Sequence, residues 1–262
     1  MVADVVGAPA PVQVEMLAGG AVWVVRLSRP KANVIDAAMT ASLDGVFRDA
    51  ALARELKAIV LAAAGPNFSF GASVPEHLPD QVAGMLHRFH GLFRTIVAAS
   101  VPVVAAVRGQ CLGGGLELAA FCHRLIAAPD AKFGQPEIAL GVFAPVASLL
   151  LPERMGRGAA EDLLLTGRTI DAQEALRRGL CDEVADDPDA VAKRWATEGL
   201  GRHSASSLRH AVRAARAHFA QRFLHELDEL ETSYLAELQP THDAREGIAA
   251  FVQKRPPTWR NA

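Results

Sequence analysis

The chain has 262 residues, of which 50% are hydrophobic and 21% are charged, and its formal net charge is −2. This length is sufficient to bury a substantial core, either in one large α/β domain or in a domain with an appendage. The nearly balanced charge argues against a strongly basic face, so we expect no nucleic-acid partner.

The N-terminal segment and the apolar stretches bear on localisation. Residues 1–16 carry Asp4 and have no basic region ahead of their apolar residues, which predicts that they are not a signal peptide. The longest candidate for a membrane span, 97–107, contains Pro102 and falls well short of the roughly 20 residues that a bilayer requires. The three cysteines show no CxxC spacing, which predicts neither a zinc site nor a disulfide framework. We therefore expect a cytoplasmic protein with no membrane partner.

Short apolar runs alternate with longer helical patterns along the first two thirds of the chain. Strands are predicted at 21–27, 57–63, 101–107 and 123–129, and helices near 36–53, 79–98, 114–121 and 145–154. A further helical pattern at 158–167 is followed by a helix at 171–180, with Asp171 as its N-cap and Gly179 at its end, and then by a strand-like segment at 181–185. This order predicts an α/β fold of stacked β/α units with mostly parallel strands.

The last quarter of the chain is helical in character. From about residue 188 the composition shifts to Ala, Arg, His, Glu and Leu, and neither Gly nor Pro interrupts the run from Ser204 to Gln239. Leu and Phe recur at helical spacing, so these helices have apolar faces that need to be covered. We expect a core at 1–195 and a C-terminal helical lobe at 196–262, which packs against the core or against a neighbouring subunit.

Two acids stand out in otherwise apolar surroundings. Gly113 and Gly114 belong to a glycine triplet that opens an apolar helical run carrying Glu117, and Glu137 follows in FGQPEIALG. A glycine triplet ahead of a helix lets a ligand approach the backbone N–H groups closely. Isolated buried glutamates are costly unless they are hydrogen-bonded or functional, which favours an acid/base pair. Alternatively, Glu117 is a surface carboxylate beside a close-packed Gly114, and Glu137 caps a helix.

A second motif lies upstream, in NFSFGASVPEH at 67–77. A short apolar strand feeds a loop that turns at Gly71. If the N–H groups of Ala72 and Gly114 converge on one point, they form a two-donor oxyanion hole that stabilises an enolate or a tetrahedral oxyanion.

The strings FSFGAS, GQCLGGGLELA and FGQPEIALG resemble the crotonase, or enoyl-CoA hydratase/isomerase, superfamily, and the resemblance runs from VVRLSRPKANVID to FVQKR. It implies a crotonase-like stacked ββα spiral core, with the C-terminal lobe assembling trimers that often pair into hexamers. It also implies an acyl-CoA thioester substrate whose oxygen binds the N–H groups of Ala72 and Gly114. Hydratases of the family carry glutamates at the positions that match Glu117 and Glu137. No metal or redox cofactor is implied, because CoA arrives as part of the substrate.

Two departures from the common hydratase pattern fall where the acyl group should lie. Ser73 stands where the family usually has Asp, and GVFAPVASLLLP, with Phe143 and Pro145, replaces a glycine-rich segment. The combination is most like the family's hydratases of cyclohexa-1,5-diene-1-carbonyl-CoA, which form 6-hydroxycyclohex-1-ene-1-carbonyl-CoA in anaerobic benzoyl-CoA degradation. The alternatives are a general short-chain enoyl-CoA hydratase or isomerase, and a non-catalytic homologue that binds CoA or RNA.

The resemblance also suggests residues that contact substrate. His77 follows the loop of Ala72 and is expected near the acyl or pantetheine channel. Lys31, in RPKAN, is expected near the CoA phosphates, and Lys254, in FVQKR, near the CoA of its own or an adjacent subunit. His87 and His90 lack metal-binding spacing and are expected to be solvated or satisfied within the core.

Overall fold

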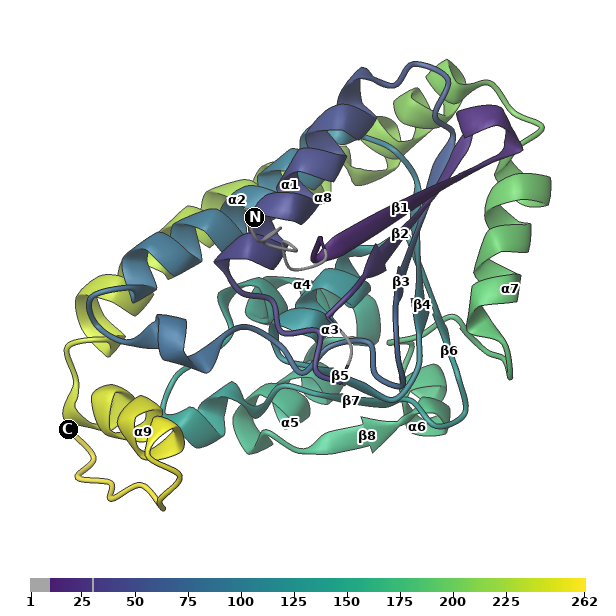
Figure 1. The fold of residues 1–262 in the computed structure, drawn as a ribbon. Coiled ribbons are helices and arrows are strands. Elements are labelled where there is room, and N and C mark those ends of the chain that lie inside the picture. Colours follow the sequence, from purple (N-terminus) through teal and green to yellow (C-terminus); the bar gives the residue numbers. More distant parts are fainter. Residues whose placement is uncertain (1–9, 30) are drawn as a thin grey trace, which may run out of the picture.

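The computed structural model describes residues 10–29 and 31–262. Residues 1–9 and residue 30 lie outside the described residues. The prediction that residues 1–16 are not a signal peptide, and the start of the expected core at 1–195, therefore fall partly outside them. In the described part of the chain, a twisted sheet is covered on one face by α1 (Ala37–Leu52), α2 (Val82–Ala99) and α8 (Ala205–Ser233). Its other face is covered by α7 (Pro188–Arg194) (Figure 1).

The main sheet has six strands, in the order β1-β2-β3-β4-β6-β9. These are β1 (Val12–Leu17), β2 (Val22–Leu27), β3 (Ala58–Ala63), β4 (Val103–Val107), β6 (Arg124–Ala127) and β9 (Glu183–Val184). From β2 to β9 every neighbouring pair is parallel, and only β1 pairs antiparallel. All of β3 is buried, which explains its continuous apolar sequence, because helices cover both faces of a parallel sheet. The mostly parallel α/β arrangement is as predicted.

Four strands were absent from the sequence prediction. The edge strand β1 has only one fully buried residue, so its apolar pattern is weak. The others form a second sheet of three strands, namely β5 (Gln110–Leu112), β7 (Lys132–Gly134) and β8 (Thr169–Asp171). Strands of three residues are too short to show a period of two. This small sheet matters because β5 leads into the glycine triplet and β7 leads into Glu137.

Seven of the principal helices agree with the prediction within a few residues, whereas α7 and α9 lie in the region that was predicted only to be helical in character. The principal helices are α1 (Ala37–Leu52), α2 (Val82–Ala99), α3 (Gly114–Phe121), α4 (Pro145–Met155), α5 (Arg157–Thr166), α6 (Ala172–Arg177), α7 (Pro188–Arg194), α8 (Ala205–Ser233) and α9 (His242–Val252). Short 3₁₀-helices are η1 (Ala18–Gly20), η2 (Val74–His77) and η3 (Pro136–Leu140), and short π-helices are η4 (Trp195–Leu200) and η5 (Tyr234–Leu238). The expected N-cap is confirmed, since the Asp171 side chain accepts from the Glu174 N–H at 2.8 Å.

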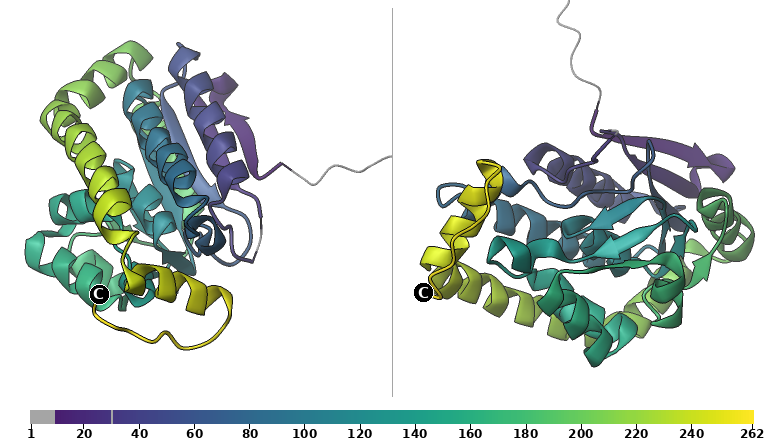
Figure 2. Two further views of the ribbon diagram at one scale, coloured as in Figure 1. Left: turned by 90° about the vertical axis from the view of Figure 1, so that its left-hand side faces the viewer. Right: turned by 90° about the horizontal axis from the view of Figure 1, so that it is seen from below.

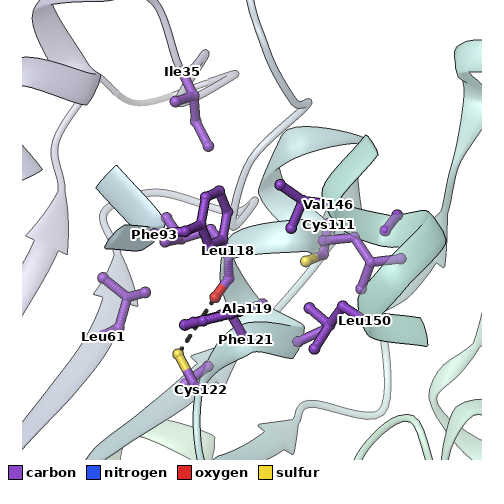
Figure 3. Close-up of a cluster of buried hydrophobic side chains, with 14 of the residues drawn as sticks. Ile35, Leu61, Phe93, Cys111, Leu118, Ala119, Phe121, Cys122, Val146 and Leu150 are labelled. Atoms are coloured by element: carbon purple, nitrogen blue, oxygen red, sulfur yellow. Dashed lines mark hydrogen bonds between the residues drawn. The ribbon is translucent and has the colours of Figure 1, made fainter. Parts of the chain in front are cut away.

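Helix α3 is surrounded on every side, and all eight of its residues are buried. Figure 3 shows Leu118 and Phe121 of this helix among side chains from several elements of the core. Aromatic rings join α3 to its neighbours, because Phe121 lies 5.0 Å from Phe93 of α2 and 5.1 Å from Phe223 of α8 between ring centroids. This packing fixes the helix that carries Glu117.

The C-terminal helices pack against the core of their own chain. Phe223 and Leu227 of α8, Tyr234 of η5 and Ile248 of α9 are all buried in the main apolar cluster. Figure 2 shows the long α8 running beside α2 and continuing into α9. The boundary at residue 195 and the role of these helices in oligomers stay predictions. None of the described helices is both long and apolar enough to traverse a bilayer.

Candidate active site

The structure brings seven of the predicted site residues together around one small cavity. They are Ala72, His77, Gly114, Glu117, Glu137, Phe143 and Pro145. The cavity has a volume of about 30 Å³, which accommodates water but not a six-membered ring. Side chains in its wall therefore have to move when an acyl group binds. Glu137, Phe143 and Ala144 also line a neighbouring cavity of about 170 Å³, so the two cavities share part of their walls.

Glu117 projects from α3 and caps a different helix. Its Oε1 accepts a hydrogen bond of 2.7 Å from the N–H of Ala147, in the first turn of α4. The residue at the N-cap position of α4 is Ala144, which has no side-chain acceptor, and Pro145 at the first helical position has no N–H. The carboxylate of Glu117 thus supplies the missing cap, and the positive end of α4 favours its ionised form.

Glu137 lies in η3 and approaches the glycine triplet. Gly113 has φ +51°, and a Cβ built there would lie 2.5 Å from Oε1 of Glu137. A side chain at position 113 would therefore displace the carboxyl group. Gln135 is buried beside it and, with its amide nitrogen facing the carboxyl group, donates to Oε2 at 2.8 Å. Gly113 and Gln135 together define where Glu137 can sit.

The backbone of Ala72 lies close to that of Gly114, and the oxyanion hole that their N–H groups would form stays a prediction. A Cβ built on Gly114 would lie 3.2 Å from the Ala72 nitrogen, so glycine keeps this space open. Gly71 holds the loop against the same turn, with φ +99° and its Cβ position 2.9 Å from the Leu112 carbonyl oxygen. Among the hydrogen bonds between described residues, neither N–H has an acceptor. Two adjacent free donors can bind one oxygen atom of a ligand.

The two carboxyl groups influence each other's protonation. Burial raises the pKa of Glu117 to about 7, against the opposing effect of the N–H groups of α4. Burial, followed by the charge of Glu117, raises the pKa of Glu137 to about 8. The pair therefore favours one ionised and one protonated carboxyl group near neutral pH, which suits one base and one acid.

This electrostatic arrangement predicts how stability depends on pH. Because the pKa of Glu137 is higher in the folded chain than its ordinary 4.5, the folded state binds more protons. The free energy of unfolding therefore falls as the pH rises from about 4.5 through about 8. We expect Glu137→Gln to raise this free energy at pH 8.5 by roughly 1–3 kcal/mol, with the difference vanishing near pH 4.5. Urea denaturation at several pH values measures it, with the exposed Glu55→Gln as the control. A pH-independent difference would contradict the coupling.

Two polar residues of the cavity were not predicted as site residues. His90 of α2 is not solvated but buried, and its Nδ1 lies 2.6 Å from Glu231 Oε2 of α8. Its Nε2 has no hydrogen-bond partner among the described residues, and neither has the hydroxyl group of Tyr234. Tyr234 is the chain's single tyrosine, which was the one available sequence signal. His87, by contrast, is exposed, as expected.

The remaining predicted residues lie outside this cavity. Ser73 precedes η2, and its carbonyl oxygen is 2.9 Å from Nδ1 of His77. Burial lowers the pKa of His77, which keeps that ring neutral at pH 7. Lys31 and Lys254 are exposed, and their proposed contacts with CoA stay predictions. Within residues 10–29 and 31–262, no group of three or more His, Cys, Asp or Glu side chains is arranged to hold a metal ion.

Comparisons with known proteins give matches along almost the whole chain. A family model described as enoyl-CoA hydratase/isomerase matches residues 18–262. The cyclohexa-1,5-dienecarbonyl-CoA hydratase of Thauera aromatica is 54% identical over 254 residues, which cover 97% of this chain and 98% of that protein. A probable enoyl-CoA hydratase of Rhizobium meliloti is 39% identical and covers 90% of this chain and 93% of its own length.

Solved structures agree with the fold. The crystal structure of a putative enoyl-CoA hydratase from Mycobacterium avium paratuberculosis K-10 superposes with a TM-score of 0.84 at 30% identity. The match covers 95% of this chain and 99% of that one.

Proposed function

Since the chain belongs to the enoyl-CoA hydratase/isomerase family, we propose that it adds water to cyclohexa-1,5-diene-1-carbonyl-CoA to give 6-hydroxycyclohex-1-ene-1-carbonyl-CoA. The observation that carries the hydratase chemistry is the pair of glutamates in one cavity with two free backbone N–H groups. The observation that favours this acyl group is the 54% identity to the Thauera aromatica enzyme over almost the whole chain.

The backbone donors stabilise the charge that develops on the thioester. When water attacks the β-carbon, electrons move onto the thioester oxygen, which the N–H groups of Ala72 and Gly114 bind. Both donors are held in place before the reaction, because Gly71 and the glycine triplet fix the two turns against each other. Preorganised donors of this kind each contribute about 10²–10³ in rate.

The two glutamates divide the work on the water molecule. Glu117 is the ionised member, because the N–H of Ala147 and the N-terminus of α4 stabilise its negative charge. It orients the water and accepts its proton. Glu137, whose pKa is raised further, is the protonated member, which hydrogen-bonds the water and can donate a proton only to a carbon next to the one that water attacks.

The segment from Phe143 to Pro145 shapes the acyl pocket. The Phe143 ring lies 5.3 Å from the ring of Tyr234, and both line the catalytic cavity. Pro145 begins α4 and leaves Phe143 on the loop before it. Because Phe143 also lines the neighbouring cavity, rotation of its ring would enlarge the space available to a six-membered ring. The proposal also includes a cytoplasmic location, assembly into trimers or hexamers, and contacts of Lys31 and Lys254 with the CoA part of the substrate.

A comparison of two substrates tests the acyl assignment. We expect kcat/KM for cyclohexa-1,5-diene-1-carbonyl-CoA to exceed that for crotonyl-CoA by at least about 10-fold, since a shaped apolar pocket discriminates by 1–3 kcal/mol. Steady-state kinetics with product identification by mass spectrometry provides the measurement. A preference for crotonyl-CoA would support the alternative, a general short-chain enoyl-CoA hydratase.

A further inference from the structure

The proposed reaction sets a geometric problem that the glutamate pair does not solve. In 1,4-addition, water attacks the β-carbon and the proton is added at the γ-carbon, on the opposite side of the six-membered ring. Two carboxyl groups that contact one water molecule can activate it for attack on one carbon and deliver a proton to the carbon next to it. A proton for the γ-carbon has to come from another part of the cavity wall.

His90 lies in such a part of the wall. It is carried by α2, whereas Glu117 and Glu137 come from α3 and η3, and all three line the same cavity. The aromatic contacts between α2, α3 and α8 hold His90 in position. Only 1% of the residue is exposed, so its polar atoms have no access to bulk water.

The hydrogen bonds of His90 define which ring nitrogen is free. Nδ1 lies 2.6 Å from Glu231, and this hydrogen bond lowers the pKa of Glu231, which is therefore ionised at neutral pH. An ionised carboxylate only accepts hydrogen bonds, so Nδ1 carries a proton. Nε2 is then the nitrogen that gains and loses a proton. This carboxylate–imidazole arrangement is typical of acid/base catalysis.

A second observation points to a ligand in the same place. Leaving a buried polar group without a partner costs about 1–3 kcal/mol. Both Nε2 of His90 and the hydroxyl group of Tyr234 lack a partner among the described residues, and both residues line the cavity that holds the glutamates. The other titratable groups that face this region are His77 of η2 and, around Glu231, His87 and Arg94 of α2.

We propose that His90, oriented by Glu231, is a third acid/base group that protonates the γ-carbon of the bound dienoyl thioester. This inference rests on the proposed function. Water's oxygen bonds to the β-carbon, one proton of that water passes to Glu117, and the π electrons move to the thioester oxygen. The electrons then return, and a C–H bond forms at the γ-carbon with the proton from Nε2, which leaves His90 neutral. After product release, the proton on Glu117 returns to His90 through water, so one water is consumed.

Substitution of His90 tests this role by comparing two substrates in the same variant. We expect His90→Gln to lower kcat for the dienoyl thioester by about 10²-fold, as for other acid/base groups. The ratio of kcat for this substrate to kcat for crotonyl-CoA should fall by at least about 10-fold, because crotonyl-CoA is hydrated across adjacent carbons.

Matched variants and an isotope label separate catalysis from folding. Glu231→Gln should reproduce the substrate-selective loss more weakly, whereas Glu229→Gln, on the exposed face of the same helix, should not. In D2O, NMR should locate deuterium at the γ-carbon of the wild-type product. Equal losses on both substrates, or no loss, would overturn the role of His90. Failure of wild type to hydrate the dienoyl thioester would instead overturn the proposed function, before any variant is made.

Discussion

Replacing either Glu117 or Glu137 by Gln is expected to reduce turnover by about 10²–10⁴, the usual contribution of an acid/base group. Glutamine keeps the shape of the side chain, but at position 117 it cannot accept the proton of water, and at position 137 it cannot supply the carboxylic acid that hydrogen-bonds the water. Thioester binding should change little, because the N–H groups of Ala72 and Gly114 remain in place. Turnover by stopped-flow or steady-state kinetics and binding by calorimetry give the two quantities separately.

The control for this experiment is the exposed Glu161, which lines the neighbouring cavity but is not part of the catalytic one. Glu161→Gln should retain near-wild-type kcat. The hydratase mechanism is wrong if both catalytic-pair variants turn over as fast as the wild type.

Deletion of residues 196–262 should abolish folding rather than release a stable core. The deletion removes Phe223, Leu227, Tyr234 and Ile248 from the main apolar cluster. Burial of each such side chain contributes about 1.5–3 kcal/mol to the free energy of unfolding. The four contributions together are therefore comparable with the roughly 5–15 kcal/mol by which a whole protein is stable. The apolar side chains of the remaining core that these residues cover would become exposed, which would also favour aggregation.

Sedimentation and circular dichroism of the truncated chain test this prediction. A full-length variant with Phe223→Ala and Leu227→Ala serves as a second measurement, because it keeps the chain length and should lose several kcal/mol of stability. A soluble, folded and active monomer after truncation would contradict the expected role of the C-terminal helices.

The sequence predicted the fold well where periodicity was strong. The buried strand β3 and the long helix α8 were both evident, because an apolar run and an uninterrupted helical pattern are each unambiguous over their lengths. The strands β5, β7 and β8 were missed because three residues cannot display a pattern. Their pairing is a tertiary effect, which local sequence does not encode.

The residues of the candidate site also divide into those that the sequence predicted and those that it did not. Glu117, Glu137 and the glycine turns belong to continuous motifs, so the residues that meet in the cavity were predictable from short strings. His90 and Tyr234 were not, because they come from α2 and η5 and meet only through packing between distant helices. A lone histidine in a helix resembles any core histidine until the carboxylate opposite it, here that of Glu231, is known.

The cap that Glu117 provides to α4 links proton transfer to the shape of the pocket. Each time Glu117 takes up a proton, the first turn of α4 loses a negatively charged acceptor, and the Phe143–Ala144 segment immediately before it loses part of its anchorage. Deprotonation restores the anchorage. The proton cycle of turnover therefore alternately weakens and restores the hydrogen bond that holds the start of α4, next to the wall of the acyl pocket.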